Sequence, residues 1–291
     1  MATIKVILQG GIGNQLFILC AAQEYARLHN REISIELGLL NDSQKEFAIL
    51  ASNFTFSQST SFKESRTTYI FFLKVLTKIV RILNKIGIRF ESLYVNTKIG
   101  FQNEFLSSKK IRFINSYLQS ADYVEDNSDV LKGINNYEVN SDIFARLEKE
   151  LLKVDPIVVH IRRADYVLFK NIYGLLSTKY FQNGIDVLNQ PLSSTVWVFT
   201  DEYFDQIREL SPGRVFVKND FELNDFETLL LMSKAKKIVI SNSTYSWWAA
   251  RLNSNNKKVI APSNWLINAE HPSGIYPKSW IVARAIWEDC E

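Results

Sequence analysis

The first forty residues carry the clearest alternation of apolar and polar positions in the chain. Residues 4–8 form a short apolar run, which the glycine-rich stretch 10–14 interrupts. Apolar residues then recur at helical spacing from 16 to 28, and residues 32–37 resemble a second strand. The pattern therefore predicts a βαβ unit whose first connection is a glycine loop.

The second half of the chain repeats the alternation. A helix is expected over residues 141–153, ended by Asp155-Pro156. The pattern then predicts strands at 157–161, 195–200, 214–217, 237–241 and 258–261, and helices at 223–234 and 244–252. Alternating strands and helices indicate mainly parallel sheets. We expect two α/β domains, residues 1–150 and 151–291, with a cleft between them.

Residues 40–68 are polar and weakly patterned, whereas residues 69–86 predict a helix that Gly87 ends. Four basic residues on this helix recur every three or four positions and so form one stripe: Lys74, Lys78, Arg81 and Lys85. Residues 63–98 hold eight basic and two acidic residues, which gives this segment a net charge of +6. The net charge of the whole chain is only +3, so the remainder of the chain is net acidic.

Composition narrows the class of protein. With 46% hydrophobic and 22% charged residues, the chain of 291 residues is globular, and its net charge of +3 does not indicate a nucleic-acid binder. It contains no apolar stretch of about 20 residues, and its start lacks an export signal, so a cytoplasmic location is expected. Two cysteines, Cys20 and Cys290, suggest neither a disulfide framework nor a zinc site.

The glycine loop Gly10–Gln15 exposes backbone N–H groups beside a helix N-terminus, which suits a phosphate or another anion. It is equally typical of a tight turn between a strand and a helix. A dinucleotide fingerprint would need a third glycine at Leu16, but Glu36 lies at a suitable distance along the chain for a ribose contact. A nicotinamide-dependent oxidoreductase therefore stays as an alternative.

His160-Ile161-Arg162-Arg163-Ala164-Asp165 follows a strand that the pattern predicts to be buried. Ligands bind at the carboxyl ends of strands in open α/β sheets. Two adjacent arginines there favour a bound anion, since guanidinium groups make forked contacts with phosphate oxygens. The alternative is a loop salt bridge between Arg163 and Asp165. His160 alone does not indicate catalysis.

Polar residues gather at two further strand ends. Ser241, Asn242, Ser243 and Thr244 precede a predicted helix, which needs only one of them as a cap, so the others suggest donors directed at a ligand. Asp201 ends another strand and could accept paired donors from a guanine edge or a ribose. No acidic pair indicates a divalent metal, and the two arginines would neutralise a leaving diphosphate in its place.

Seven segments, in order along nearly the whole chain, together resemble glycosyltransferase family 11, the α-1,2-fucosyltransferases. They are GGIGNQLF (10–17), SYLQSADYV (116–124), HIRRADY (160–166), FTDE (199–202), SNSTYSWWAARL (241–252), VIAPSNW (259–265) and YPKSWI (276–281). The resemblance implies a GT-B architecture of two Rossmann-like domains, GDP-fucose as donor, inversion at the anomeric carbon and no cofactor or metal. It implies a galactoside acceptor, which in bacterial members often belongs to a surface polysaccharide.

The resemblance also implies roles for single residues. Arg162 and Arg163 would hold the donor diphosphate, and Asn14 would lie near the glycosidic oxygen. Asp165 would support the arginines or act as base. The remaining expected donor contacts are Gly11 and Gly13 of the glycine loop, His160 near the nucleotide, Asp201 near the guanine, and Ser243 and Thr244 near the phosphates.

Several positions depart from the family pattern: Ala164 and Ala249 replace usual glycines, and Arg251 replaces a large apolar residue. Thr244 and Tyr245 are milder departures. These departures are compatible with GDP binding but leave the sugar of the donor undetermined. A related donor such as GDP-colitose is therefore the nearest alternative. A binding protein without turnover is a more distant one. The basic stripe on residues 74–85 is either a solvated face or, if the acceptor is lipid-linked, a contact with the inner membrane surface.

Overall fold

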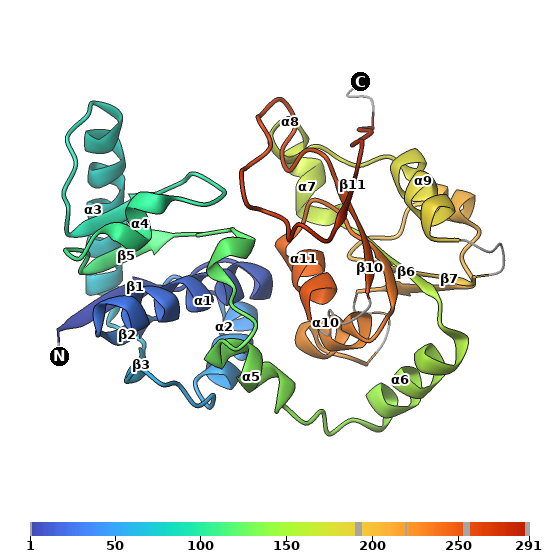
Figure 1. Ribbon diagram of the computed structural model, residues 1–291, viewed down its shortest axis with the longest axis horizontal. Coiled ribbons are helices and arrows are strands. Elements are labelled where there is room, and N and C mark those ends of the chain that lie inside the picture. Colours follow the sequence, from blue (N-terminus) through green and yellow to red (C-terminus); the bar gives the residue numbers. More distant parts are fainter. Residues whose placement is uncertain (1, 190–193, 219, 221, 253–256, 289–291) are drawn as a thin grey trace. The chain divides into compact units, whose positions relative to one another are not determined.

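The computed structural model describes residues 2–189, 194–218, 220, 222–252 and 257–288. The chain divides into two compact units. Unit 1 comprises residues 1–137 together with 272–275, and unit 2 comprises residues 138–271 and 276–291. Each unit has its own parallel sheet, as the alternation of strands and helices predicts (Figure 1).

Unit 1 contains a five-stranded sheet in the order β3-β2-β1-β5-β4, and every strand pair in it is parallel. Its strands are β1 (Thr3–Ile7), β2 (Glu32–Glu36), β3 (Thr60–Lys63), β4 (Leu93–Asn96) and β5 (Phe113–Ser116). Its helices are α1 (Ile12–His29), α2 (Asp42–Ala51), α3 (Thr67–Lys85), α4 (Asn103–Ser107), η1 (Ala121–Tyr123) and α5 (Asp129–Asn135). The expected βαβ opening is therefore confirmed.

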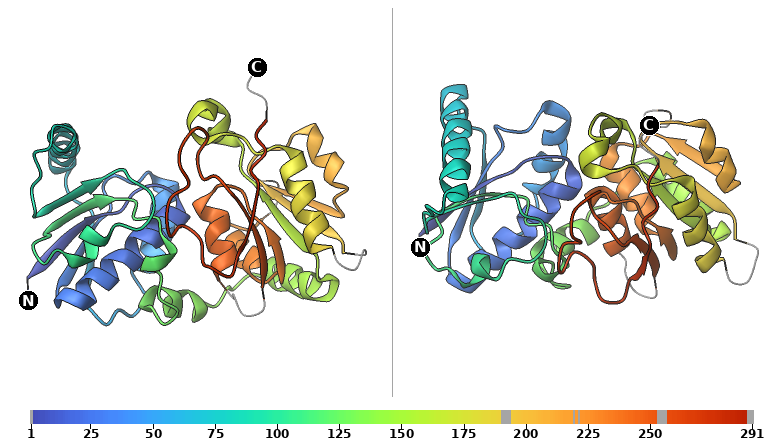
Figure 2. Two further views of the ribbon diagram at one scale, coloured as in Figure 1. Left: turned by 45° about the horizontal axis from the view of Figure 1, so that its top comes forward. Right: turned by 90° about the horizontal axis from the view of Figure 1, so that it is seen from above.

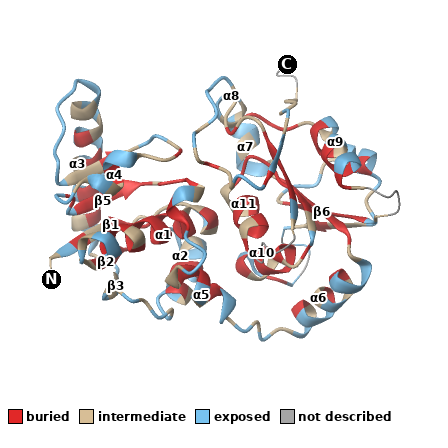
Figure 3. Cartoon of the chain, viewed as in Figure 1, coloured by how far each residue is buried: buried red, intermediate tan, exposed pale blue. Residues whose placement is uncertain are grey.

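Helices cover both faces of the unit 1 sheet (Figure 2). Side chains alternate across a strand, so Lys5 and Ile7 of β1 point to one face and Ile4 and Val6 to the other. On the first face α3 packs against Ile7 and Phe113. On the opposite face lies α1, whose residues from Gln15 to Ala26 are nearly all buried (Figure 3).

Unit 2 contains a six-stranded parallel sheet in the order β11-β10-β9-β6-β7-β8. Its strands are β6 (Ile157–Ile161), β7 (Val196–Thr200), β8 (Arg214–Val217), β9 (Lys237–Val239), β10 (Lys258–Pro262) and β11 (Ile281–Ala283). Its helices are α6 (Asp142–Val154), α7 (Ala164–Leu168), α8 (Lys170–Tyr173), α9 (Thr178–Leu188), η2 (Asp205–Leu210), α10 (Asp225–Ser233) and α11 (Thr244–Arg251). This strand order is that of a Rossmann sheet.

The division between the units falls one helix earlier than the expected break between residues 150 and 151. The cause is α6, which is held to unit 2 by two ion pairs. Glu148 lies 2.8 Å from the Lys234 ammonium, and Glu150 lies 2.6 Å from the Arg214 guanidinium. Periodicity located this helix correctly, but the side on which it packs depends on contacts with residues more than sixty positions away.

Segment 40–68, which showed no clear pattern, contains α2 and the edge strand β3. Asn41 caps α2 in a capping box with Gln44, so a local polar signal marks its start. Trp247 and Trp248 of α11 are both fully buried, so both belong to the core of unit 2.

Candidate donor site

The predicted donor residues of unit 2 gather where the direction of strand order reverses. β6 lies between β7 and β9 in the sheet. From β6 the chain adds β7 and β8 on one side of the sheet, and then crosses to add β9, β10 and β11 on the other side. Arg162 follows β6, Asp201 follows β7 and Ser241 follows β9. Because all three strands are parallel, these residues meet at one edge of the sheet, the position at which such folds bind ligands.

Asp201 organises the loop after β6. Its Oδ1 atom accepts hydrogen bonds from the backbone N–H groups of Arg163 at 2.8 Å and Ala164 at 3.3 Å. Its Oδ2 atom lies 2.9 Å from the Arg162 guanidinium. The side chain is only 7% exposed. Asp201 was expected to receive donors from a guanine, but in this conformation both oxygens are engaged within unit 2.

Arg162 lies between two carboxylates. It contacts Asp201 on its buried side and Asp165 at 2.8 Å, and its side chain stays 28% exposed. Burial by itself lowers the pKa of Arg162, but the carboxylates of Asp201 and Asp165 more than offset this and raise it, so the guanidinium stays charged. One fixed cation therefore reaches the surface at the sheet edge.

Arg163 does not pair with Asp165, the partner that a salt bridge within the loop would require. Its guanidinium pairs with Glu288 near the end of the chain, while Asp165 pairs with Arg162. The Arg163 guanidinium also lies 4.1 Å from the ring centre of Phe204. The alternative of an Arg163–Asp165 pair is therefore wrong, and Glu288, 125 residues away, is a contact for which the sequence offered no signal.

His160 belongs to the floor of the site. The ring is buried, its Nδ1 atom lies 3.2 Å from the Ser241 hydroxyl, and the Tyr245 ring packs beside it. Burial, with a smaller contribution from the Arg162 charge, lowers the pKa of His160 to about 3. The imidazole is therefore neutral at physiological pH.

The serine-rich segment splits into two groups. Ser241 contacts His160, and the Asn242 amide donates to the carbonyls of Tyr173 and Trp265, so both side chains serve the fold. Ser243 and Thr244 make no side-chain hydrogen bond within the described residues, and no side chain caps α11. Hydroxyl and backbone donors at this helix start are therefore available to an anion.

Tyr166 completes this edge and was not singled out from the sequence. Its hydroxyl donates to the Asn242 carbonyl at 3.0 Å, and its ring stacks on Tyr173. Burial raises the pKa of Tyr166, so its phenol stays protonated. The ring also lies under the Arg162 guanidinium, 5.7 Å from its centre, and so limits where that side chain can move.

The glycine loop of unit 1 lies at the carboxyl end of β1. Gly10 has a φ of 76°, which favours glycine, and a side chain on Gly11 would meet no atom within 4 Å. Gly13 is buried in the first turn of α1. The Asn14 amide oxygen accepts a hydrogen bond from Gln119 at 2.7 Å, which fixes the orientation of the Asn14 side chain. Gln119 belongs to the weakly matching segment 116–124.

The contacts of Glu36 weaken the nicotinamide alternative. The residue is only 2% exposed, and its Oε1 atom accepts hydrogen bonds from the backbone N–H groups of Gly38 at 3.1 Å and Ser65 at 3.0 Å. Its Oε2 atom accepts from the Ser65 hydroxyl. A ribose would have to displace these internal donors, so Glu36 shapes the loops beside β2 instead.

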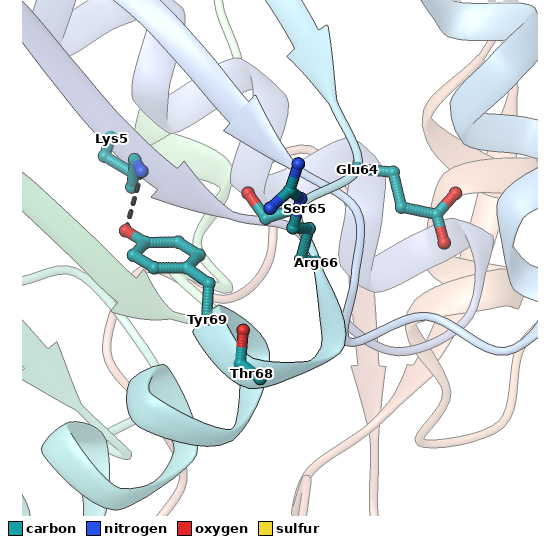
Figure 4. A pocket seen from close by; sticks show the side chains of 6 residues that line it. All are labelled: Lys5, Glu64, Ser65, Arg66, Thr68 and Tyr69. Carbon is teal, nitrogen blue, oxygen red and sulfur yellow. Dashed lines mark hydrogen bonds between the residues drawn. The ribbon is translucent and has the colours of Figure 1, made fainter.

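A shallow hollow of about 440 Å³ lies elsewhere in unit 1, at the start of α3. Figure 4 shows its lining residues, Lys5, Glu64, Ser65, Arg66, Thr68 and Tyr69. The Lys5 ammonium donates to the Tyr69 hydroxyl at 2.7 Å across it. None of the predicted donor residues lines this hollow, so shape alone does not locate the predicted site.

The described part of the chain shows neither a cluster of metal-binding side chains nor a membrane-spanning helix. Among these residues no group of three or more histidine, cysteine, aspartate or glutamate side chains is arranged to hold a metal ion. No helix in the same ranges combines the length and apolar character needed to cross a bilayer.

Comparison with known proteins identifies the family of the chain. The model of glycosyl transferase family 11 matches residues 3–284. The Escherichia coli O-antigen biosynthesis glycosyltransferase WbnK is 26% identical over 306 residues, which cover 94% of this chain and 98% of that protein. The alpha-1,2-colitosyltransferase of Escherichia coli is also 26% identical, over 303 residues that cover 97% and 99%.

One solved structure supports the architecture. The ADP-heptose lps heptosyltransferase II of E. coli aligns with a TM-score of 0.51 at 10% identity, over 98% of this chain and 91% of that one. Two units with parallel sheets, together with this likeness, give the chain a fold of the GT-B type. The chain belongs to glycosyltransferase family 11.

Proposed function

We propose that the protein transfers L-fucose from GDP-fucose to the 2-hydroxyl of a galactoside, with inversion at the anomeric carbon and without a metal. The observation that carries this proposal is the arginine pair at the sheet edge of unit 2. There Arg162 and Arg163 lie beside β7, and the start of α11 presents the unengaged hydroxyls of Ser243 and Thr244. Guanidinium groups and the donors of a helix start suit the oxygens of a diphosphate.

The chemistry follows from charge development. The fucosyl ring acquires oxocarbenium character while negative charge grows on the departing GDP. Guanidinium groups and helix N–H groups that are already oriented stabilise this charge without reorganisation. In the proposed complex the diphosphate competes with Asp165 and Glu288 for the two arginines, whereas the buried Asp201 keeps Arg162 in position.

Asp165 has two candidate roles in the proposed reaction. A general base must take the proton of the acceptor hydroxyl as the new bond forms. The 2.8 Å contact between Asp165 and Arg162 favours a supporting role, since this carboxylate already holds the guanidinium. In unit 1, Asn14 would approach the glycosidic oxygen with the orientation that Gln119 gives it.

GDP-colitose is the second candidate donor. It is favoured by the match over 97% of this chain to a protein named alpha-1,2-colitosyltransferase. The match to WbnK, named for O-antigen biosynthesis, supports an acceptor within a surface polysaccharide, which could be lipid-linked. Screening both GDP-sugars against simple β-galactosides, with linkage analysis of the product, distinguishes the two donors. No transfer from either would contradict both assignments.

The binding half of the proposal is tested by Arg162→Ala. Loss of a charged hydrogen-bond partner costs about 2 kcal/mol, so the dissociation constant for GDP, measured by calorimetry, should rise about thirtyfold. Arg214→Ala is the matched control, since Arg214 also belongs to unit 2 and pairs with a carboxylate, Glu150 at 2.6 Å, but lies on β8. Unchanged GDP affinity in Arg162→Ala would contradict the assignment.

A further inference from the structure

Helix α3 has one face that the fold explains. Ile70, Leu73 and Val80 are buried and pack against a cluster that includes Ile7 and Phe113 of the unit 1 sheet. At 3.6 residues per turn these positions share one side of the helix. A helix on the surface of a globular domain normally carries polar residues on the opposite side.

The opposite side of α3 is instead apolar. Phe71 is 68% exposed, Ile79 48% and Ile82 53%, and these positions lie roughly opposite the buried row on a helix of 3.6 residues per turn. The exposed apolar residues on and just after the helix are Phe71, Phe72, Val75, Ile79, Ile82, Ile86, Ile88 and Phe90. Exposed positions recur along the whole of α3 (Figure 3). Apolar side chains exposed along one whole face of a helix mark an interaction surface.

A row of cations runs along one edge of this patch. Lys74, Lys78, Arg81 and Lys85 fall on one stripe, between the buried face and the exposed apolar face. None of the four forms an ion pair with any residue that the structure describes. Like charges one turn apart repel, so the stripe favours an anionic partner.

We infer that the α3 surface, meaning these eight apolar residues and the four cations beside them, docks unit 1 on an anionic lipid bilayer. The apolar side chains would enter the boundary between headgroups and acyl chains, and the cations would contact lipid phosphates. Charge complementarity favours lipid over a second copy of this chain. Face-to-face packing of two α3 surfaces would bring two unpaired cationic rows together without any acid to offset them.

Docking of this kind goes beyond the proposed transfer and does not depend on it. It concerns unit 1, whereas the predicted diphosphate contacts of the arginines lie in unit 2. If the acceptor is carried on a lipid, docking would hold the enzyme at the surface where that acceptor is found. Binding to vesicles can be measured with neither donor nor acceptor present, so failure of the transferase proposal would leave the measurement intact.

The experiment is co-sedimentation of the full chain with vesicles of phosphatidylcholine alone or mixed equally with phosphatidylglycerol. The unaltered protein should bind the mixed vesicles, and binding should weaken as salt screens the charges. A charge variant, with Lys74, Lys78, Arg81 and Lys85 all changed to Gln, should lose at least about tenfold in affinity. An apolar variant, Phe71→Ser with Phe72→Ser and Ile79→Ser, should lose binding to a similar extent.

The control changes exposed apolar residues on helices of unit 2. Leu152 of α6 is 55% exposed and Val187 of α9 is 54% exposed, so Leu152→Ser with Val187→Ser should leave vesicle binding unchanged. Far-ultraviolet circular dichroism and the midpoint of urea unfolding check that each variant is folded. The inference is overturned if the unaltered protein ignores anionic vesicles or if both α3 variants still bind. It is equally overturned if the protein is a dimer that the apolar variant dissociates.

Discussion

Replacing Asp201 with asparagine keeps the size of the side chain but removes the charge that holds the loop after β6. The two backbone N–H bonds from Arg163 and Ala164 would then end on a neutral oxygen, at a cost of about 0.5 kcal/mol each. The lost ion pair with Arg162 adds about 1 kcal/mol. That figure lies below the 3–5 kcal/mol typical of fully buried pairs, because Arg162 is 28% exposed and retains Asp165.

The assay can observe unit 2 by itself, because all six tryptophans lie there. Urea unfolding followed by tryptophan fluorescence should show unit 2 destabilised by about 2 kcal/mol in Asp201→Asn. Asp205→Asn is the matched control, since it makes the same chemical change at an exposed position shortly after the same strand. Its effect should stay within about 0.5 kcal/mol.

Affinity for GDP separates two explanations of the same site. If the site worked through net charge alone, removing an acid would strengthen GDP binding. If Asp201 acts by orienting Arg162 and the loop, the variant should bind GDP about tenfold more weakly, as calorimetry would measure. Tighter GDP binding by Asp201→Asn, or an unchanged free energy of unfolding, would refute the positioning role.

Two further predictions concern buried groups of unit 2. The folded pKa of His160, about 3, lies below the unfolded value of 6.5, so the unfolded state takes up the proton first and stability falls as pH drops below about 6.5. Between about pH 7 and pH 5, unaltered unit 2 should lose about 2 kcal/mol more stability than His160→Gln, measured by urea unfolding; parallel losses would show that this histidine titrates normally. The Lys257 ammonium donates to the carbonyls of Ser233, Ala249 and Leu252 at 2.6, 3.1 and 2.8 Å, where α10 and α11 end. Lys257→Met should therefore destabilise unit 2 by about 2 kcal/mol, whereas Lys258→Met at the exposed neighbouring position should not, and equal effects would argue against this capping role.

Periodicity located the elements that have a strong local signal. The strand at 157–161 has the predicted bounds, and the helix expected over 141–153 is displaced by one residue. Three strands of unit 1 were not predicted, and each has only four residues: β3, β4 and β5. β3 and β4 lie at the edges of their sheet, where half-exposed side chains give little pattern, whereas β5 is fully buried and too short to show a period. The helix expected over 69–86 is present as Thr67–Lys85.

The candidate site was only partly open to prediction. Strand ends placed Arg162, Asp201 and Ser241 at one sheet edge, because in parallel sheets the carboxyl ends coincide. The sequence did not predict that the Ser241 hydroxyl would contact His160 rather than a ligand. Nor did it predict that Glu36 would accept hydrogen bonds from the backbone of Gly38 and Ser65. Such roles depend on which buried polar groups lie within hydrogen-bonding distance of one another. That is determined only when the segments pack together in the folded chain.

What the sequence determined by itself was local: the alternation of strand and helix, the glycine loop, the arginine pair after a buried strand, and the charge stripe of α3. Tertiary structure alone decided the long-range partners. Arg163 meets Glu288 across 125 residues and His160 meets Ser241 across 81. The physical reason is that periodicity and turn chemistry act over a few residues, whereas an ion pair or a buried hydrogen bond forms only between groups that the packed sheet brings within about 3 Å.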